Sequence, residues 1–454
     1  MTPTSRSPSE QTIETSLADW VACASNTSAA DEGIARALLL DSLGVMESGS
    51  RSSVAQKLMA ATNDDAGMSS PAPARRVPSS ALAVQRGTAG AAELWDDTSL
   101  RMLTHPSVPI LAALLAEATH LKQTLGEFLS SFTVGLEVQL AVAGATSDGM
   151  YQRGFHATGV LGSIGAAGAV ARARRMDARG ARAAMGVAAS LGSGLRVQFG
   201  SDAMPLHSGF AASHGVQAAQ LGGRGITADP QWLTGRHGFA ATFAGQERVG
   251  TWDGPLGLSH ADIVVKQYPV GAPNVAPVNA ALQLMDQWPH QPEEIVEVRC
   301  HVHKWVLNTV KLDPPDVASG GRVSLPYCVS AAISLGDNLS EAFLGDGRIS
   351  KELHTLSGKV HVEVSDVLDD AGRPTAKIEV LTQSRQRLSA IAHDAYILPE
   401  LDAANGARLR MKFRRNWRRP NAEAVERFVV EADLKESVDR LLDLIPYPQN
   451  GTPS

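Results

Sequence analysis

The sequence has few cysteines, no block of charge of one sign and no long apolar run. Its three cysteines, Cys23, Cys300 and Cys328, are odd in number and widely spaced, which argues against a disulfide framework and a cysteine-ligated zinc site. Its 41 basic and 47 acidic residues are mixed, so no basic stripe indicates nucleic acid as a partner. The N-terminus, MTPTSRSPSEQT, lacks the apolar core of a signal peptide, and no apolar run approaches the roughly 20 residues of a membrane span. We therefore expect a cytoplasmic protein that binds neither nucleic acid nor membranes.

The most distinctive stretch is residues 153–172, RGFHATGVLGSIGAAGAVAR. A glycine inside a helix costs about 1 kcal/mol relative to alanine, so three glycines spaced three apart predict close approach by another helix or a ligand. Thr158 stands at an N-cap position, which places His156 at a helix N-terminus, where the macrodipole favours a carboxylate. A dinucleotide fingerprint is disfavoured, because no strand precedes the glycines and no acidic residue follows at the right distance. A histidine satisfied in the core is the alternative for His156.

Helical periodicity dominates roughly the first 250 residues and returns near the C-terminal end of the 454-residue chain. The pattern changes near residue 262, after which three segments alternate with a period of two, as half-buried strands do. Helices are expected over residues 12–25, 29–47, 80–93, 108–120, 125–145, 178–191, 207–222, 326–335 and 425–445, strands over 295–304, 359–365 and 376–381, a loop over 63–76 and a turn near Gly345.

These patterns predict a mainly α fold with an inserted α+β domain. A multihelical large domain is expected from residues 12–262, completed by residues 399–446 from the other end of the chain. A smaller α+β domain, residues 263–398, is expected to act as a lid. The composition, 44% hydrophobic and 19% charged, suits a globular protein with a sizeable core.

Eight stretches, in this order along the chain, resemble the MmgE/PrpD family, which includes 2-methylcitrate dehydratase, cis-aconitate decarboxylase and iminodisuccinate epimerase. Each motif is weak by itself, and the far C-terminus is only loosely similar. The stretches are LLLDSLGVMESG (38–49), ALAVQRGTAGAAELWDDT (81–98), THPSVPILAALLAEA (104–118), TVGLEVQLAVAGA (133–145), GFHATGVLGSIGAAGAVAR (154–172), MPLHSGFAASHGVQAAQLGGRGITA (204–228), KQYPVGAPNVAPVNAALQL (266–284) and LPYCVSAAISLGD (325–337).

The resemblance implies a multihelical domain with a smaller α+β domain, a homodimer and catalysis without metal or organic cofactor. It implies a small di- or tricarboxylic acid as substrate and proton removal next to a carboxylate. Loss of water or of CO2 would make the protein a lyase, either a dehydratase or a decarboxylase. Return of the proton would make it an isomerase or epimerase, and a non-catalytic binding or scaffold dimer is the third hypothesis.

Such chemistry needs a base with a near-neutral pKa, groups that hold carboxylates and an acid. The resemblance makes His105 the first choice for acid–base catalysis and His156 the second, with Tyr327 reaching the site from the lid. Asp96 and Asp97 have capping of the next turn as an alternative role. The substrate-binding set that the resemblance implies is Lys266, Asp96, Asp97, Thr98, Met204 and His207, of which His207 is expected to shape its loop.

Two departures from the family pattern fall in the expected pocket. Met204 stands where many members carry lysine, and Leu94 stands where they carry aspartate. These changes predict a substrate with fewer carboxylates, a different bond broken or a loss of activity. His301 and His303 share one strand face, but without a third ligand nearby a surface pair is favoured over a metal site.

Overall fold

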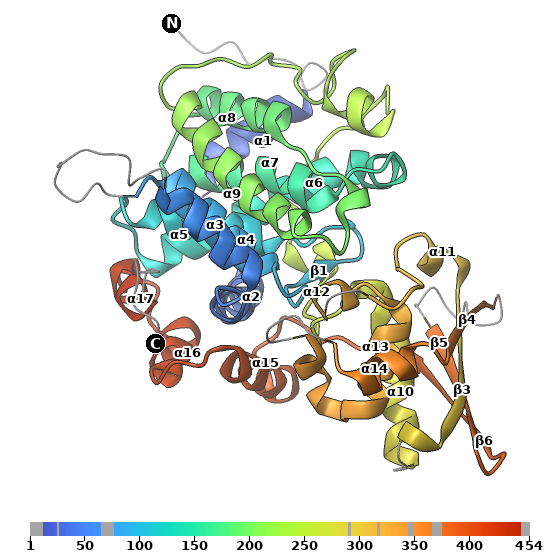
Figure 1. Cartoon of the computed structure of the whole chain (residues 1–454). Helices are drawn as coiled ribbons and strands as arrows, with labels where there is room; N and C mark the ends of the chain where they lie inside the picture. Colours follow the sequence, from blue (N-terminus) through green and yellow to red (C-terminus); the bar gives the residue numbers. More distant parts are fainter. Residues whose placement is uncertain are drawn as a thin grey trace, which may run out of the picture.

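The computed structural model describes residues 12–24, 27–64, 77–288, 292–315, 318–343, 349–365 and 375–445. Two hydrophobic cores divide the chain into a helical domain and a smaller α+β domain (Figure 1). The first core takes residues from 13–265 and again from 397–445, and the second takes residues from 268–390. The expected fold class is therefore confirmed. The domain boundaries at 262 and 398 stay predictions, and the expected turn near Gly345 and most of the 63–76 loop lie outside the described residues.

Helices build the large domain, and the expected ones are found with small shifts at their ends. Helix α3 was not predicted, whereas α15 lies in the C-terminal part of the chain where a helical pattern was expected. Residues 425–445 form parts of two helices, because Ser437 accepts a hydrogen bond from the backbone N–H of Asp439 and caps a new helix. The helices are α1 (Ile13–Cys23), α2 (Ala29–Gly49), α3 (Ser53–Asp64), α4 (Ser79–Ala91), α5 (Ser107–Ala118), α6 (Leu125–Gln152), α7 (Ala157–Ala173), α8 (Ala178–Leu191), α9 (Ala203–Gly222), α15 (Ala403–Asn416), α16 (Ala422–Glu431) and α17 (Val438–Leu444).

The glycines of α7 allow the neighbouring helices to pack against its backbone. A Cβ added at Gly162 would lie 3.0 Å from Cγ of Pro109 in α5. A Cβ added at Gly165 would lie 2.4 Å from Cγ of Gln139 in α6. Side chains larger than hydrogen would push these helices apart, so the predicted close approach is confirmed.

The N-terminus of α7 differs from the prediction in one residue. The N-cap is His156, so this histidine does lie at the helix N-terminus as expected. Thr158 is inside the first turn, and the prediction that it is the N-cap is wrong. Its hydroxyl instead accepts a hydrogen bond from the backbone N–H of His105, at 3.0 Å, which joins the start of α5 to α7.

The small domain is a four-stranded mixed sheet packed against helices. The strand order is β4-β3-β5-β6, with β3 and β4 parallel and the other neighbours antiparallel. The three predicted strands are confirmed, whereas β6 and helices α10 and α14 were not predicted. The elements are α10 (Val275–Gln287), β3 (Ile295–Val302), α11 (Lys304–Leu307), α12 (Ala318–Gly321), α13 (Leu325–Leu335), α14 (Lys351–Ser357), β4 (Val360–Val364), β5 (Thr375–Thr382) and β6 (Arg387–His393).

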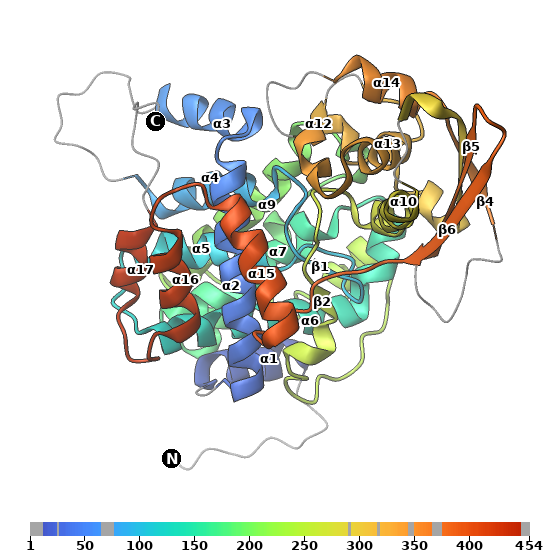
Figure 2. The same cartoon turned by 90° about the horizontal axis from the view of Figure 1, so that it is seen from below.

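The C-terminal segment returns to the helical domain and supports the loop that follows α4. Figure 2 shows α15 lying along α2. Lys412 of α15 pairs with Asp41 of α2 at 2.6 Å, and both side chains are buried. The same ammonium group donates to the backbone carbonyl of Trp95 at 2.6 Å. This contact fixes the backbone just before Asp96.

Among the described residues, α6 is the one helix with the length and composition to cross a membrane. Its most apolar 18-residue window is 78% buried inside the protein, as is also found for core helices.

Candidate active site

A two-stranded ribbon brings two distant motifs together. Strand β1 (Thr98–Ser99), which follows the two aspartates, pairs antiparallel with β2 (Ile263–Val264). The indole N–H of Trp95 also donates to the carbonyl of Gln267 at 3.0 Å. The residues beside these contacts, Asp96 and Lys266, therefore face each other across the ribbon although 170 residues separate them.

Asp96 and Lys266 form a buried ion pair. The ammonium nitrogen of Lys266 lies 3.1 Å from Oδ1 of Asp96, and the two side chains are 0% and 1% exposed. Asp96 Oδ1 is also 3.7 Å from Nδ1 of His105. The pair therefore lies behind His105, and Lys266 is not among the residues that line the cavity described below. In this arrangement Lys266 balances the charge of Asp96 and does not reach a ligand.

His105 is held in one tautomer by these neighbours. Its Nδ1 lies 2.7 Å from the backbone carbonyl of Asp97, which can only accept a hydrogen bond. Nδ1 therefore carries the proton, and Nε2 is left with its lone pair. Burial lowers the pKa of His105 below 6.5, although the charge of Asp96 opposes this shift. A neutral imidazole with a free Nε2 is the form that accepts a proton.

Asp97 holds the start of α5. Its carboxylate accepts hydrogen bonds from the hydroxyl and the backbone N–H of Ser107. Burial raises the pKa of Asp97 to about 7, although the hydrogen bond from Ser107 opposes this shift. The capping role considered for the two aspartates is therefore found at Asp97, whereas Asp96 is the partner of Lys266.

His156 and His207 form a second pair. Their Nδ1 atoms lie 2.9 Å apart, so one ring donates to the other. Burial lowers the pKa of both, and full burial beside the guanidinium of Arg196 lowers that of His156 well below 6.5. Two neutral imidazoles that share this hydrogen bond can exchange tautomers. The Nε2 atom of His156 can then be either a donor or an acceptor.

His105 and His156 line the same cavity, which has a volume of about 160 Å³ and lies where the two domains meet. Their ring centroids are 6.4 Å apart. The cavity suits a small acid, because pockets for drug-sized ligands have roughly 300–1,000 Å³. It is lined by Leu94, Thr98, Ser99, Leu100, Leu103, Thr104, His105, Tyr151, His156, Phe199, Met204, Gly271, Ala272, Pro273, Asn274, Trp305, Thr309, Val310, Val323 and Tyr396.

The structure brings four of the sequence-predicted site residues to this cavity and places the others behind or away from it. Tyr327 is buried in the small domain, where its hydroxyl donates to the carbonyl of Ala342 at 2.9 Å and its ring packs on Phe343. Its catalytic role finds no support in this geometry. Those that line the cavity are His105, His156, Thr98 and Met204, and those behind it are Asp96, Asp97, Lys266 and His207.

Sequence reasoning did not single out two polar residues of the cavity. Burial raises the pKa of Tyr396, so its phenol stays protonated and can donate. Asn274 is fully buried, its amide nitrogen donates to the carbonyl of Arg322, and its Oδ1 has no hydrogen-bond partner among the residues that the structure describes. Asn274 belongs to the quoted KQYPVGAPNVAP stretch, but an asparagine in such a loop gives no chemical signal by itself.

The two histidines expected on one strand face lie on different elements: His301 is in β3, whereas His303 follows the strand, and both are half-buried. His301 contacts Glu379 at 3.0 Å and Glu363 at 3.5 Å, and His303 caps α11. Within the described ranges, no group of three or more histidine, cysteine, aspartate or glutamate side chains could hold a metal ion.

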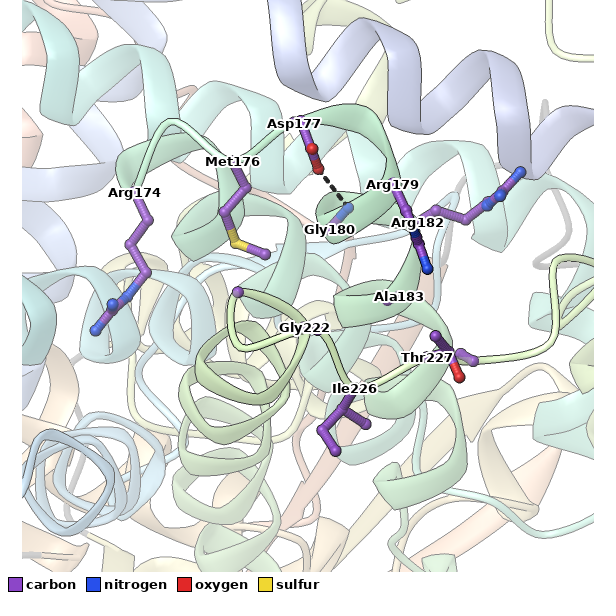
Figure 3. Close-up of a pocket in the computed structure, with 13 residues that line it drawn as sticks. Arg174, Met176, Asp177, Arg179, Gly180, Arg182, Ala183, Gly222, Ile226 and Thr227 are labelled. Carbon is purple, nitrogen blue, oxygen red and sulfur yellow. Dashed lines mark hydrogen bonds between the residues drawn. The ribbon is translucent and has the colours of Figure 1, made fainter.

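A larger, open depression of about 760 Å³ lies between the start of α8 and the end of α9 (Figure 3). Arg174 on its rim already donates to Glu117, and Arg182 donates to Thr15. Asp177 caps α8 through Gly180, as the dashed line shows. None of the predicted site residues lines this depression, so the cavity with the two histidines is the candidate active site.

Comparisons with known proteins agree with the resemblance seen in the sequence. The MmgE/PrpD N-terminal domain matches residues 15–251, and the MmgE/PrpD C-terminal domain matches residues 268–436. Cis-aconitate decarboxylase of Mus musculus is 26% identical over 343 residues, which are 72% of this chain and 70% of that protein. Cis-aconitate decarboxylase of Homo sapiens is 33% identical over 176 residues, which are 37% of this chain and 36% of that protein.

Proposed function

The chain belongs to the MmgE/PrpD family, and we propose that it is a cofactor-independent lyase, a dehydratase or decarboxylase, of a small di- or tricarboxylic acid. The family and the similarity to cis-aconitate decarboxylases support an enzyme of lyase type in the broad sense. The finer proposal rests on the hydrogen bond of His105. The backbone carbonyl of Asp97 accepts the Nδ1 proton, so Nε2 keeps its lone pair and can accept a proton.

His105 is the proposed base. In a dehydration, Nε2 takes the proton from the carbon next to a carboxylate, and the electron pair of that C–H bond forms the new double bond. The hydroxyl group on the neighbouring carbon leaves as water with a proton from an acid. Asp96, 3.7 Å from Nδ1, stabilises the imidazolium that forms, as buried carboxylates do behind catalytic histidines.

His156 is the proposed acid, and its partner His207 supports this role. When His207 donates to Nδ1 of His156, the proton of His156 resides on Nε2 and can be given to the leaving group. In a decarboxylation, the C–CO2 bond breaks first and its electron pair remains on the carbon skeleton. His156 then protonates that carbon, so the pair of His156 and His207 can supply the acid in either lyase reaction.

An isomerase or epimerase is the second candidate, and the placement of the two histidines favours it. Epimerisation requires one group to remove a proton and another to return it from the opposite face of the carbon. His105 and His156 line one cavity with ring centroids 6.4 Å apart, so both rings can reach the same bound acid.

Proton NMR in D2O separates these reactions. The purified protein is incubated with 2-methylcitrate, citrate, cis-aconitate, iminodisuccinate and simpler monocarboxylates. New vinyl signals or release of CO2 would establish a lyase, and deuterium exchange at one carbon without a new skeleton would establish the isomerase. If no acid in the panel reacts at high protein concentration, the proposed function is wrong for this substrate set.

We also propose a homodimer in the cytoplasm. Light scattering coupled to size-exclusion chromatography tests the first part, because a dimer has twice the 47.8 kDa mass of the chain. A monomer at all accessible concentrations would contradict it. Immunofluorescence with organelle markers tests the second part.

A further inference from the structure

Part of the cavity lining is an apolar wall. Leu94, Met204 and Val323 are 6–7% exposed and form one buried cluster, against which Phe199 packs. All four side chains line the cavity. They come from the loop after α4, from α9, from the turn before α13 and from the segment before α9, so the wall is built from both domains.

The backbone fixes the direction of one member of this wall. Leu94 has φ of 51°, in the left-handed region that residues other than glycine seldom adopt. Its backbone N–H is held by the carbonyl of Ala91 at 3.2 Å. The backbone therefore fixes the direction of its Cα–Cβ bond, and its side chain clusters with Met204 and Val323.

Charged side chains are absent from the described residues that line the cavity, which include neither lysine, arginine, aspartate nor glutamate. Three cations lie near the cavity, and one of them, Lys311, has its ammonium group beside Gly200 at the Val323 end of the wall. The other two are engaged elsewhere. Lys266 pairs with Asp96, and Arg196 donates to the carbonyls of Tyr151 and Asn308 while its guanidinium lies 3.7 Å from the ring centroid of Tyr151. A carboxylate placed between Leu94, Met204 and Phe199 would lose its water and would meet no Lys or Arg among the lining residues, which is strongly unfavourable.

We propose that the substrate of this site is a small acid with an uncharged aliphatic arm, which packs on Leu94, Met204, Val323 and Phe199 in place of a further carboxylate. The inference rests on the proposed function, since it concerns the acid that the two histidines act on. The reacting carbon and its carboxylate lie toward His105 and His156, and the arm lies on the wall.

A matched pair of unreactive acids tests the proposal by isothermal titration calorimetry at pH 7. Propane-1,2,3-tricarboxylate and 2-isobutylsuccinate share one skeleton and differ in one arm, which ends in a carboxylate in the first acid and in an isopropyl group in the second. We expect 2-isobutylsuccinate to bind the wild-type protein at least roughly tenfold more tightly. Because this comparison uses the unaltered chain, it does not depend on the folding of a variant.

Two substitutions then assign the preference to the wall. Met204→Lys adds a cation and is expected to reverse the order of the two acids, while Met204→Leu keeps the wall apolar and is expected to retain it. If the tricarboxylate binds the wild type more tightly, or if Met204→Lys binds both acids in the wild-type ratio while it remains folded by circular dichroism, the inference is wrong and the proposed function stands. If neither acid binds at millimolar concentration, the acid site itself is wrong.

Discussion

Replacement of Asp96 by asparagine is expected to destabilise the protein through Lys266. The two side chains are 1% and 0% exposed, and Asp96 Oδ1 is 3.1 Å from the ammonium nitrogen. Asparagine leaves that ammonium group buried without an anion. Removal of one partner of a buried pair costs about 3–5 kcal/mol, so we expect the free energy of unfolding to fall by about this amount. Urea denaturation followed by circular dichroism measures it.

A double-mutant cycle isolates the interaction from other effects of the substitution. Lys266→Met alone is also expected to cost about 3–5 kcal/mol, because it leaves the carboxylate of Asp96 buried without its cation. The free energy of unfolding of the double variant, with Asp96→Asn and Lys266→Met, is expected within about 2 kcal/mol of the wild-type value. Neither new side chain is charged, so no unpaired charge is buried. If the double variant loses as much as the two single variants together, the pair does not interact and our description of the site is wrong.

The same variants are expected to shift the pH dependence of catalysis in opposite directions. Asp96 raises the pKa of His105, and Lys266 lowers it. In the acid limb of kcat/KM, Asp96→Asn therefore moves the midpoint to lower pH and Lys266→Met moves it to higher pH. Shifts of both variants in one direction would show that the limb does not report His105.

Three further predictions concern helix packing and the two histidines. Gly165→Ala, whose Cβ would lie 2.4 Å from Cγ of Gln139, is expected to destabilise the protein by about 1–3 kcal/mol. Gly144→Ala, whose Cβ would meet no described atom within 4 Å outside the nearby backbone of its own helix, is expected to stabilise α6 by roughly 0.5–1 kcal/mol. Thermal denaturation measures both, and equal effects would refute the packing argument. Because burial holds the pKa of His105 below 6.5, the midpoint of the acid limb of kcat/KM is expected below pH 6.5; a midpoint above pH 6.5 would contradict this. His207→Ala removes the Nδ1 partner of His156. Because one hydrogen bond contributes about 1 kcal/mol, kcat is expected to fall about fivefold to tenfold. An unchanged kcat in steady-state assays would show that catalysis does not use this hydrogen bond.

The helical part of the fold could be predicted because its signals are local. The glycines of α7 indicated close packing, and the structure places Pro109 and Gln139 against them. Strand β6 was missed because its alternation is weak, with one buried residue, Ala390, among exposed and half-buried ones. Its position is set by pairing with β5 across the sheet, which is a tertiary contact.

The histidines of the site could also be predicted, whereas the roles of the charged residues could not. A sequence shows that Lys266 exists but not that it is fully buried on Asp96, because their contact depends on the pairing of β1 with β2. Tyr327 has a hydroxyl suited to catalysis, but this hydroxyl is buried in the core and donates a hydrogen bond to the carbonyl of Ala342. The contact of Met204 with Leu94 and Val323 could not be predicted either, because it depends on the packing of α9 against the segment before α13.

The proposed role of His105 is tested most directly by His105→Gln in the NMR assay in D2O. Our account predicts that the rate of proton exchange or product formation falls by roughly 10²–10⁴-fold, because the proton acceptor is lost. His120→Gln, the same substitution on an exposed side chain just after the other end of α5, is expected to retain the wild-type rate. Turnover by His105→Gln at the wild-type rate, with the wild-type circular dichroism spectrum, would contradict the account.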